Sequence, residues 1–248
     1  MMTNSIIARF NIPGMTATGL REVTSILDLE TGAGNFIADA FEGVIVTDTD
    51  APRNKGFQIF QSKAVSDRIL CGQFDTINEL LASMSAREHK ANSLPIINIT
   101  MPPTFEIYDG DAYRDVEQYA QLKDSTGKVI ALVDKVFTRS SLRITLCAED
   151  KPTVTMLASA LATHLRLYTS KGRARFTAQT MLMGIPLLLN GEIENPKMLS
   201  FDAQTLPFGD SRVYAQTLSL DIVGEILQAI EVKAIPSRIE VFSGALAK

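Results

Sequence analysis

The sequence predicts a soluble α/β (α+β) protein: a mixed, largely antiparallel β-sheet with amphipathic helices packed on it. The first observation behind this is residues 151–169, where apolar residues recur at the three- and four-residue spacing of a helix with one buried face. The second is the alternation of apolar and polar residues, as in 142–146, which is typical of a sheet with one wet face. The third is the run 124–127 (Asp-Ser-Thr-Gly) between two strand-like segments, which indicates a hairpin turn.

The helix expected at 151–169 has signals at both ends. Asp150 can cap its first turn, and Pro152 suits a position where a missing N–H costs nothing. Lys171 and Gly172 would end it, with a cation near the negative helix terminus and a permissive C-cap. We therefore expect this helix to lie on the main sheet.

Two further helices are expected nearer the start of the chain. One covers about 76–90, where Thr76 and Glu79 have capping-box spacing. The other covers 18–29, where four apolar residues fall at helical spacing: Leu20, Val23, Ile26 and Leu27. Between and after the helices the pattern predicts strands at 57–62, 94–100, 115–123, 128–137, 140–148, 174–181, 197–206, 212–223 and 237–243.

The length of 248 residues allows one large domain or two small ones. Pro102-Pro103 and the Asp109-Gly110-Asp111 loop interrupt the pattern, so one interpretation places a boundary near 92–104. Residues 1–93 would then be an N-terminal elaboration with helices, and 94–248 an α/β core. The other interpretation is a single domain.

Composition excludes several classes of protein. A formal net charge of −4 does not favour electrostatic binding to the phosphates of nucleic acid, so we expect no sequence-specific nucleic-acid binding. The first residues lack the apolar core of a signal peptide, and no stretch is long and apolar enough for a membrane helix. Cys71 and Cys147 lie in apolar contexts and are expected to be buried, reduced thiols.

No constellation predicts catalysis. Nucleophilic catalysis usually needs a histidine base, and the two histidines, His89 and His164, lie at positions that indicate solvated surface. A nucleophile elbow of the G-x-S-x-G type is absent from the sequence. We therefore expect the protein not to be an enzyme.

Two segments resemble cofactor-binding or metal-binding motifs, but each lacks a residue that the motif requires. Gly32-Ala33-Gly34 lacks the third glycine of a dinucleotide-binding loop, because Ile37 stands in its place. Asp48-Thr49-Asp50 begins like a calcium loop, but Pro52 and Arg53 follow where a ligand and a glycine are needed. We expect no catalytic, cofactor-binding or metal-binding residues, and no cofactor.

Two charged groups are candidate interface residues. The basic group lies at the end of the long helix and the start of the next strand: Arg166, Lys171, Arg173 and Arg175. It either compensates the helix dipole or contacts an acidic neighbour or passing nucleic acid. The acidic group lies in one loop: Asp109, Asp111 and Asp115. A contact between the two groups on neighbouring copies would set orientation more than strength.

The order of elements in the second part of the chain carries a family resemblance. A strand leads into a capped helix and further strands over 142–175, and a long strand from Arg212 and a final Ser-Arg-Ile-Glu-Val-Phe run follow. This order resembles the tail terminator and tail completion (neck) proteins of tailed bacteriophages, across roughly 94–248.

The resemblance implies a virion structural protein, made in the host cytoplasm, that forms a homo-oligomeric ring of six copies at the tail end or neck. Its partners would be further copies of itself and other tail or neck proteins, with no membrane involved. Residues 1–93 exceed the small core of that family, which leaves a neck, sheath-associated or baseplate role open. The alternative is an enzyme or small-ligand-binding α/β protein whose site is assembled from scattered residues.

Overall fold

The computed structural model describes residues 15–234 except 86–93, 111–112, 169–173, 195, 197 and 209–210. It contains one mixed, mostly antiparallel sheet with helices packed on it, which confirms the predicted α+β class. The expected strand at 237–243 and His89 lie outside the described residues.

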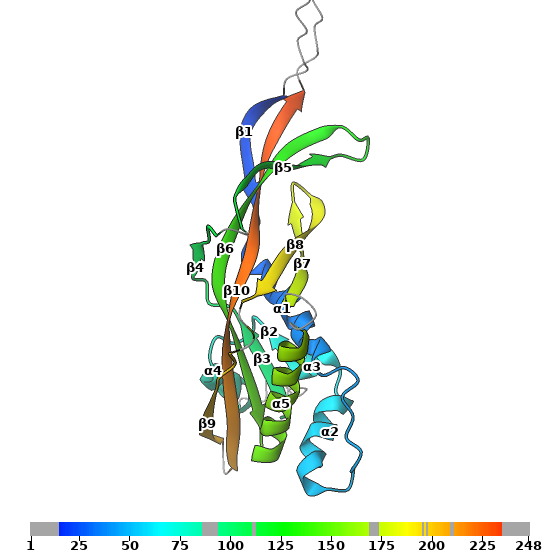
Figure 1. Cartoon of the computed structure of the whole chain (residues 1–248), viewed down its shortest axis with the longest axis vertical. Helices are drawn as coiled ribbons and strands as arrows, with labels where there is room; N and C mark the ends of the chain where they lie inside the picture. Colours follow the sequence, from blue (N-terminus) through cyan, green and yellow to red (C-terminus); the bar gives the residue numbers. More distant parts are fainter. Residues whose placement is uncertain are drawn as a thin grey trace, which may run out of the picture.

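Two unusually long strands form the spine of the molecule (Figure 1). β6 (Val129–Ala148) pairs antiparallel with β10 (Ser211–Ala234) without a break from Ala131 to Ala148. At about 3.3 Å per residue, β6 alone spans roughly 65 Å. The strands cross as they twist, and every other strand of the sheet pairs directly or through a neighbour with one of them.

Shorter strands line the outer edge of each spine strand. Along β10 the described strands are β1 (Met15–Val23), β8 (Ile185–Ile193) with β7 (Ala174–Leu182) outside it, and β9 (Phe201–Phe208). Along β6 they are β5 (Val116–Lys123), β4 (Phe105–Ile107), and β3 (Ile96–Thr100) with β2 (Ile69–Cys71) parallel outside it.

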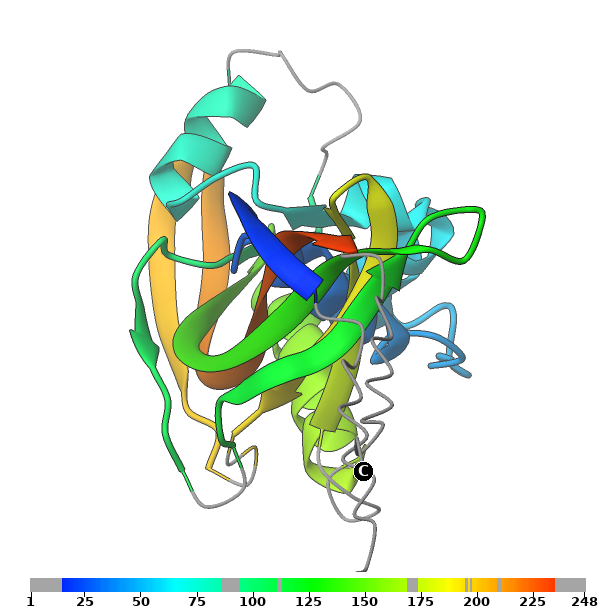
Figure 2. The same ribbon diagram turned by 90° about the horizontal axis from the view of Figure 1, so that it is seen from above.

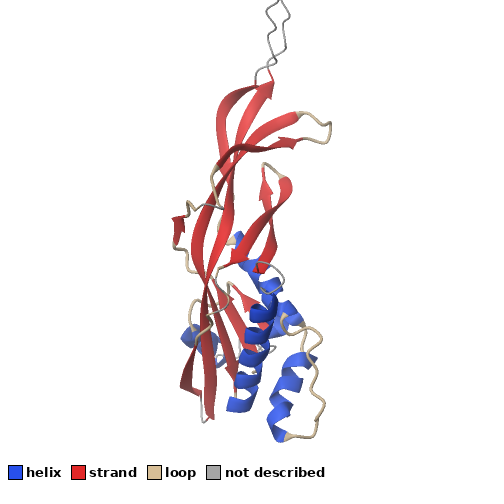
Figure 3. Cartoon of the chain, in the orientation of Figure 1, coloured by secondary structure: helices blue, strands red, loops and turns tan. Residues whose placement is uncertain are grey.

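The helices gather at one end of the spine, and the other end is built of strands alone (Figure 3). α5 (Lys151–Tyr168) and α1 (Asp28–Asp39) cover one face of the sheet, and α4 (Ile77–Ser85) covers the opposite face (Figure 2). A short 3-10 helix (Pro52–Asn54), α2 (Lys55–Ser62) and α3 (Val65–Arg68) pack beside them.

The predicted amphipathic helix is confirmed as α5. Asp150 caps it, because its carboxylate accepts hydrogen bonds from the backbone N–H and the hydroxyl of Thr153, both at 2.8 Å. Leu157, Leu161 and Leu165 are fully buried against the sheet, as the apolar stripe predicts. Burying each of these side chains stabilises the fold by about 1.5–3 kcal/mol.

Two other local predictions are also confirmed. Thr76 caps α4 by accepting a hydrogen bond from the Glu79 N–H, although the described helix ends at Ser85. The turn at 124–127 joins β5 to β6, with Gly127 at φ 83° and the Asp124 carboxylate accepting hydrogen bonds from Thr126 and Lys128.

Two elements were predicted with the wrong secondary structure. Residues 18–29 are not one helix: they hold the end of β1 and the start of α1, and Leu20 and Val23 are exposed on the strand. Pairing with β10 decides this segment, and Gly19 at φ 91° supplies a bulge that a helix would not accept. Residues 57–62 lie in α2 rather than a strand, because Phe57 and Phe60 bury one helical face.

Strand lengths also differ from the prediction. Segments 128–137 and 140–148 are one continuous strand, β6, and 212–223 is the first part of the longer β10. The hairpin of β7 and β8 was not predicted beyond its first strand. Its two-residue loop, Met183-Gly184, has positive φ at both positions (50° and 72°), a geometry that Asn-Gly usually marks and Met-Gly does not.

The larger of two buried hydrophobic clusters joins residues from both sides of 92–104. Leu29 and Phe36 of α1 belong to the same buried cluster as Leu161 of α5 and Ile222 of β10. β1 pairs with β10 as well. Residues of the first 93 positions therefore complete the same sheet and core as the later residues.

Candidate functional site

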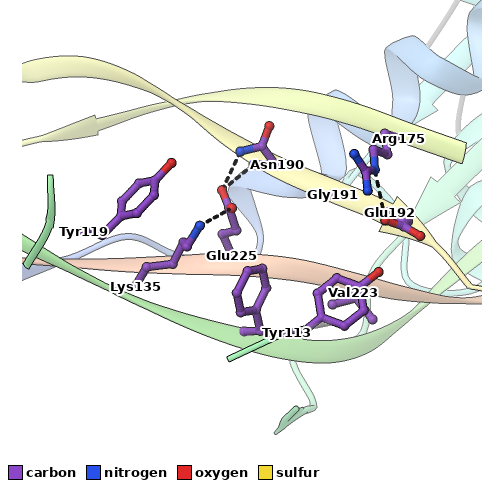
Figure 4. Close-up of a pocket in the computed structure, with 10 residues that line it drawn as sticks. Tyr113, Tyr119, Lys135, Arg175, Asn190, Gly191, Glu192, Val223 and Glu225 are labelled. Carbon is purple, nitrogen blue, oxygen red and sulfur yellow. Dashed lines mark hydrogen bonds and ion pairs between the residues drawn. The ribbon is translucent and has the colours of Figure 1, made fainter. Parts of the chain in front are cut away.

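A polar pocket of about 350 Å³ lies between the β5–β6 and β7–β8 hairpins, over β10 (Figure 4). Its lining comes from the loop after β4, which supplies Tyr113, and from the strands β5, β6, β7, β8 and β10: Tyr113, Tyr119, Lys135, Phe137, Arg175, Asn190, Gly191, Glu192, Val223 and Glu225. No short motif links these residues, so sequence reasoning identified only Arg175 among them.

Glu225 forms the centre of this pocket, although it is almost completely buried. One carboxylate oxygen lies 3.2 Å from Lys135 Nζ, and the other accepts hydrogen bonds from the backbone N–H and the side-chain amide of Asn190, at 2.9 and 2.7 Å. The carboxylate thereby joins β10, β6 and β8. Burying a charge requires such compensation.

The other charges of the pocket are also compensated within the chain. The Lys135 ammonium lies 3.8 Å from the centre of the Tyr119 ring, and Arg175 Nε donates to Glu192 at 3.1 Å. The lining therefore holds two ion pairs with no net charge. It can accept a small polar or aromatic molecule, but its cations and carboxylates stabilise each other rather than a reacting group.

Neither free cysteine has the lowered pKa of a reactive thiol. Cys147 is buried, as predicted, and burial raises the pKa of its thiol to about 12. Cys71 is only half-buried; burial, followed by the nearby Glu30 carboxylate, raises its pKa to about 11. Among the described residues no group of three His, Cys, Asp or Glu side chains is placed to hold a metal ion.

His164 is not the solvated residue that the sequence predicted. Its ring is half-buried and meets the Phe36 ring edge-on at 5.7 Å. Burial lowers the pKa of the imidazole, while the Asp39 carboxylate acts in the opposite direction. The side chain therefore belongs to the packing between α5 and α1.

The motifs resembling nucleotide and calcium sites have structural roles. Gly32 lies where α1 crosses β7, and a Cβ there would come within 2.5 Å of the Thr177 carbonyl oxygen. Asp48 forms a turn, accepting a hydrogen bond from the Ala51 N–H at 3.2 Å. No helix in the described part of the chain is long and apolar enough to cross a membrane.

The predicted interface residues lie on two different edges of the sheet. Asp109 and Asp115 are exposed in the loop after β4. Arg175 is exposed on β7, and Arg166 is exposed in the last turn of α5, the helix that precedes β7 in the sequence. Lys171, Arg173 and Asp111 lie outside the described residues. In the part of the chain that the structure describes, β4 pairs with β6 alone and β7 with β8 alone, so the acidic and basic groups flank opposite edges of the sheet.

These two edges also carry exposed apolar side chains. We call β4 with β5 the β4–β5 edge, and β1 with β7 the β1–β7 edge. Seven large apolar residues on them expose between 39% and 63% of their surface. The β4–β5 edge has Phe105, Ile107, Val116 and Tyr119, and the β1–β7 edge has Leu20, Val23 and Met181.

Comparison with known proteins adds no family: no family model matches the chain, and no curated protein matches it.

Proposed function

We propose that the chain is a structural subunit that assembles with copies of itself into a closed ring. The observation that carries this proposal is the pair of sheet edges, which no further strand of the described residues covers and which bear exposed apolar side chains. Open strand edges are ready-made pairing surfaces, and exposed apolar residues gathered on them favour contact with another protein.

The difference between the two edges favours a ring over a two-fold dimer. A dimer uses the same patch on both subunits, whereas two different complementary patches join subunits head to tail, and the array closes if the rotation allows. The flanking charges support the same arrangement: acidic residues follow β4, and basic residues lie at and just before the start of β7. Their attraction would orient the subunits.

The place of such a ring in a biological assembly follows from the resemblance of element order. We propose six copies at the tail end or neck of a tailed bacteriophage, in contact with other tail or neck proteins. A capped helix on a sheet (α5), followed by further strands such as β7 and then by the long strand β10, is the feature that supports this placement.

The test is cryo-electron microscopy of the concentrated protein and of any phage particle made alongside it. We expect closed rings in the first sample and a ring of this chain at one end of the tail in the second. A protein that stays monomeric at all concentrations and is missing from every particle would contradict the proposal.

A second candidate function is the binding of a small molecule in the polar pocket. Three aromatic rings around two ion pairs favour a flat polar ligand of modest size (Figure 4). A screen of such compounds by thermal shift, repeated with Asn190→Leu, would test it. Stabilisation that the variant abolishes supports a ligand site, and no stabilisation by any compound counts against it.

A further inference from the structure

One wall of the polar pocket over β10 is aromatic (Figure 4). Tyr113, in the loop after β4, meets Phe137 of β6 edge-on, with the two ring centres 5.2 Å apart. Tyr119 of β5 lies further along this wall, because the Lys135 ammonium is 3.8 Å from the centre of its ring and 5.0 Å from that of Phe137. Aromatic rings bind other flat rings by offset stacking or edge-to-face contact. This wall therefore suits a planar ligand.

The facing wall is polar and belongs to the β7–β8 hairpin. Arg175 projects from β7, and Asn190 and Glu192 project from β8. Arg175 and Glu192 are directly paired in the hairpin, so their side chains point to the same face, which is the face of the pocket. A planar ligand on the aromatic wall therefore turns one edge toward these polar groups.

The charged groups of the pocket differ in their exposure to solvent. The side chains of Glu225 and Glu192 are 5% and 12% exposed, whereas that of Arg175 is 66% exposed. Both carboxylate oxygens of Glu225 already have partners, Lys135 on one and Asn190 on the other. A ligand that enters the pocket therefore meets an accessible cation, while the carboxylates are largely buried.

Arg175 also keeps hydrogen-bond donors for a ligand. Its Nε donates to Glu192 at 3.1 Å, and no hydrogen bond within the described part of the chain uses its two Nη groups. The planar guanidinium presents its donors as a rigid fork that matches the two oxygens of a carboxylate. The polar wall can therefore bind a carboxylate at Arg175.

From these two walls we infer that the pocket binds an aromatic carboxylate, with its ring on Tyr113 and Phe137 and its carboxylate on the Nη groups of Arg175. This inference rests on the second candidate function, ligand binding in the pocket, and names the class of ligand. The volume of about 350 Å³ lies near the lower end of the usual range for ligand pockets, so the ligand is a compound of one or two rings.

Three compounds of nearly the same shape test the choice of ligand class. Benzoate, benzamide and benzamidine share one ring and one planar substituent, but they are anionic, neutral and cationic at neutral pH. Titration of the isotope-labelled full chain, followed by the NMR signals of its backbone amides, gives the dissociation constants. We expect benzoate to bind about ten-fold more tightly than benzamide, because its hydrogen bonds to Arg175 are charge-assisted, and benzamidine to bind least. Benzoate binding no tighter than benzamide overturns the inference.

Variants of single residues test where the two parts of the ligand lie. Arg175→Gln should weaken benzoate about ten-fold and leave benzamide unchanged, because it removes the charge and the fork. Arg143→Gln is the matched control: it removes an exposed arginine of β6 that does not line the pocket, and both affinities should stay as in the parent. Tyr113→Ala should weaken both compounds alike, since both place a ring there. Equal effects of Arg175→Gln and Arg143→Gln on benzoate overturn the inference.

The same titrations separate this inference from the candidate function on which it rests. If benzamide or benzamidine binds at least as well as benzoate, and Asn190→Leu abolishes that binding, the pocket is a ligand site for another class of compound and only the inference is wrong. If no compound of any charge binds, both the inference and the second candidate function fail. The proposed ring is independent of either result.

Discussion

Glu225 illustrates how a single side chain holds distant strands in register. Its buried carboxylate contacts Lys135 on β6 and Asn190 on β8, and its backbone belongs to β10. We expect Glu225→Ala to lower the free energy of unfolding by about 3–5 kcal/mol, because the mutation leaves the Lys135 ammonium without its buried partner. Urea denaturation followed by circular dichroism measures the loss.

Two further variants test the physical reason. Glu117→Ala, on the exposed face of β5, should change stability by at most about 0.5 kcal/mol. The double variant Glu225→Leu/Lys135→Met removes both charges and should recover most of the stability lost in Glu225→Ala. A double variant no more stable than the single one would show that the pair itself is not the source of the effect.

The two thiols give a prediction about pH. Their pKa values of about 11 and 12 lie above the ordinary value of 9.0, so both thiols stay protonated in the folded protein at neutral pH. At pH 8 a thiol of pKa 11 is thiolate in about one molecule in a thousand. We expect iodoacetamide to label the folded protein slowly and the urea-unfolded protein rapidly, with Cys71 reacting before Cys147.

The same pKa values set the sign of the effect on stability. Because the folded-state pKa is raised, the contribution of both thiols is fully present below about pH 9 and falls as pH rises through 11. Fast labelling of the native protein at pH 8, measured by mass spectrometry, would contradict the burial of these groups.

At the scale of elements, α5 is the clearest case of a helix fixed by its packed face. Leu161 is completely buried between the helix and the sheet, whereas Thr163 on the same helix is exposed. We expect Leu161→Asp to destabilise the fold by several kcal/mol, because the charge has no partner in the core. Thr163→Asp is the matched control and should melt close to the parent temperature; equal melting temperatures for the two variants would mean that α5 is not packed in this way.

Elements with strong local signals were predictable from the sequence, and elements decided by distant pairing were not. Asp150 and Thr76 identified two helix starts because capping is a local hydrogen bond. Leu20 and Val23 suggested a helix because their spacing fits one, yet the segment is an edge strand whose partner lies about 200 residues away. No window along the chain contains that information.

The candidate site was predictable only in part, for the same reason. Arg175 and the acidic residues near Asp109 could be recognised as charged groups, but their positions on opposite edges depend on strand register. The strand pairings also place five residues from five strands in one row: Glu106, Arg139, Val223, Glu192 and Arg175. Glu225 gave no signal, because a lone glutamate in a strand pattern does not reveal that it is buried.

At the scale of the whole molecule, the two-stranded spine fixes where the strands on its two sides lie relative to each other. Because β6 and β10 run almost the full length of the molecule, a contact on one edge has a defined height relative to the other edge (Figure 1). Head-to-tail contacts between such edges close into a ring only if the rotation between neighbouring copies allows it.

The measurement that tests this account most directly is a mixing experiment with two variants, each blocked at one edge. Glu106→Lys/Val116→Lys blocks the β4–β5 edge, and Leu20→Lys/Val23→Lys blocks the β1–β7 edge. All four positions are exposed, so we expect both variants to fold. Lysine on both blocked edges also prevents these edges from attracting each other.

Sedimentation velocity of each variant alone and of the equimolar mixture gives the answer. We expect each variant to be monomeric alone, and the mixture to form a one-to-one heterodimer through the remaining intact β4–β5 and β1–β7 edges. If either variant still forms rings or dimers alone, or if the mixture stays monomeric at concentrations where the parent chain assembles, the two edges are not partners and the proposed ring is wrong.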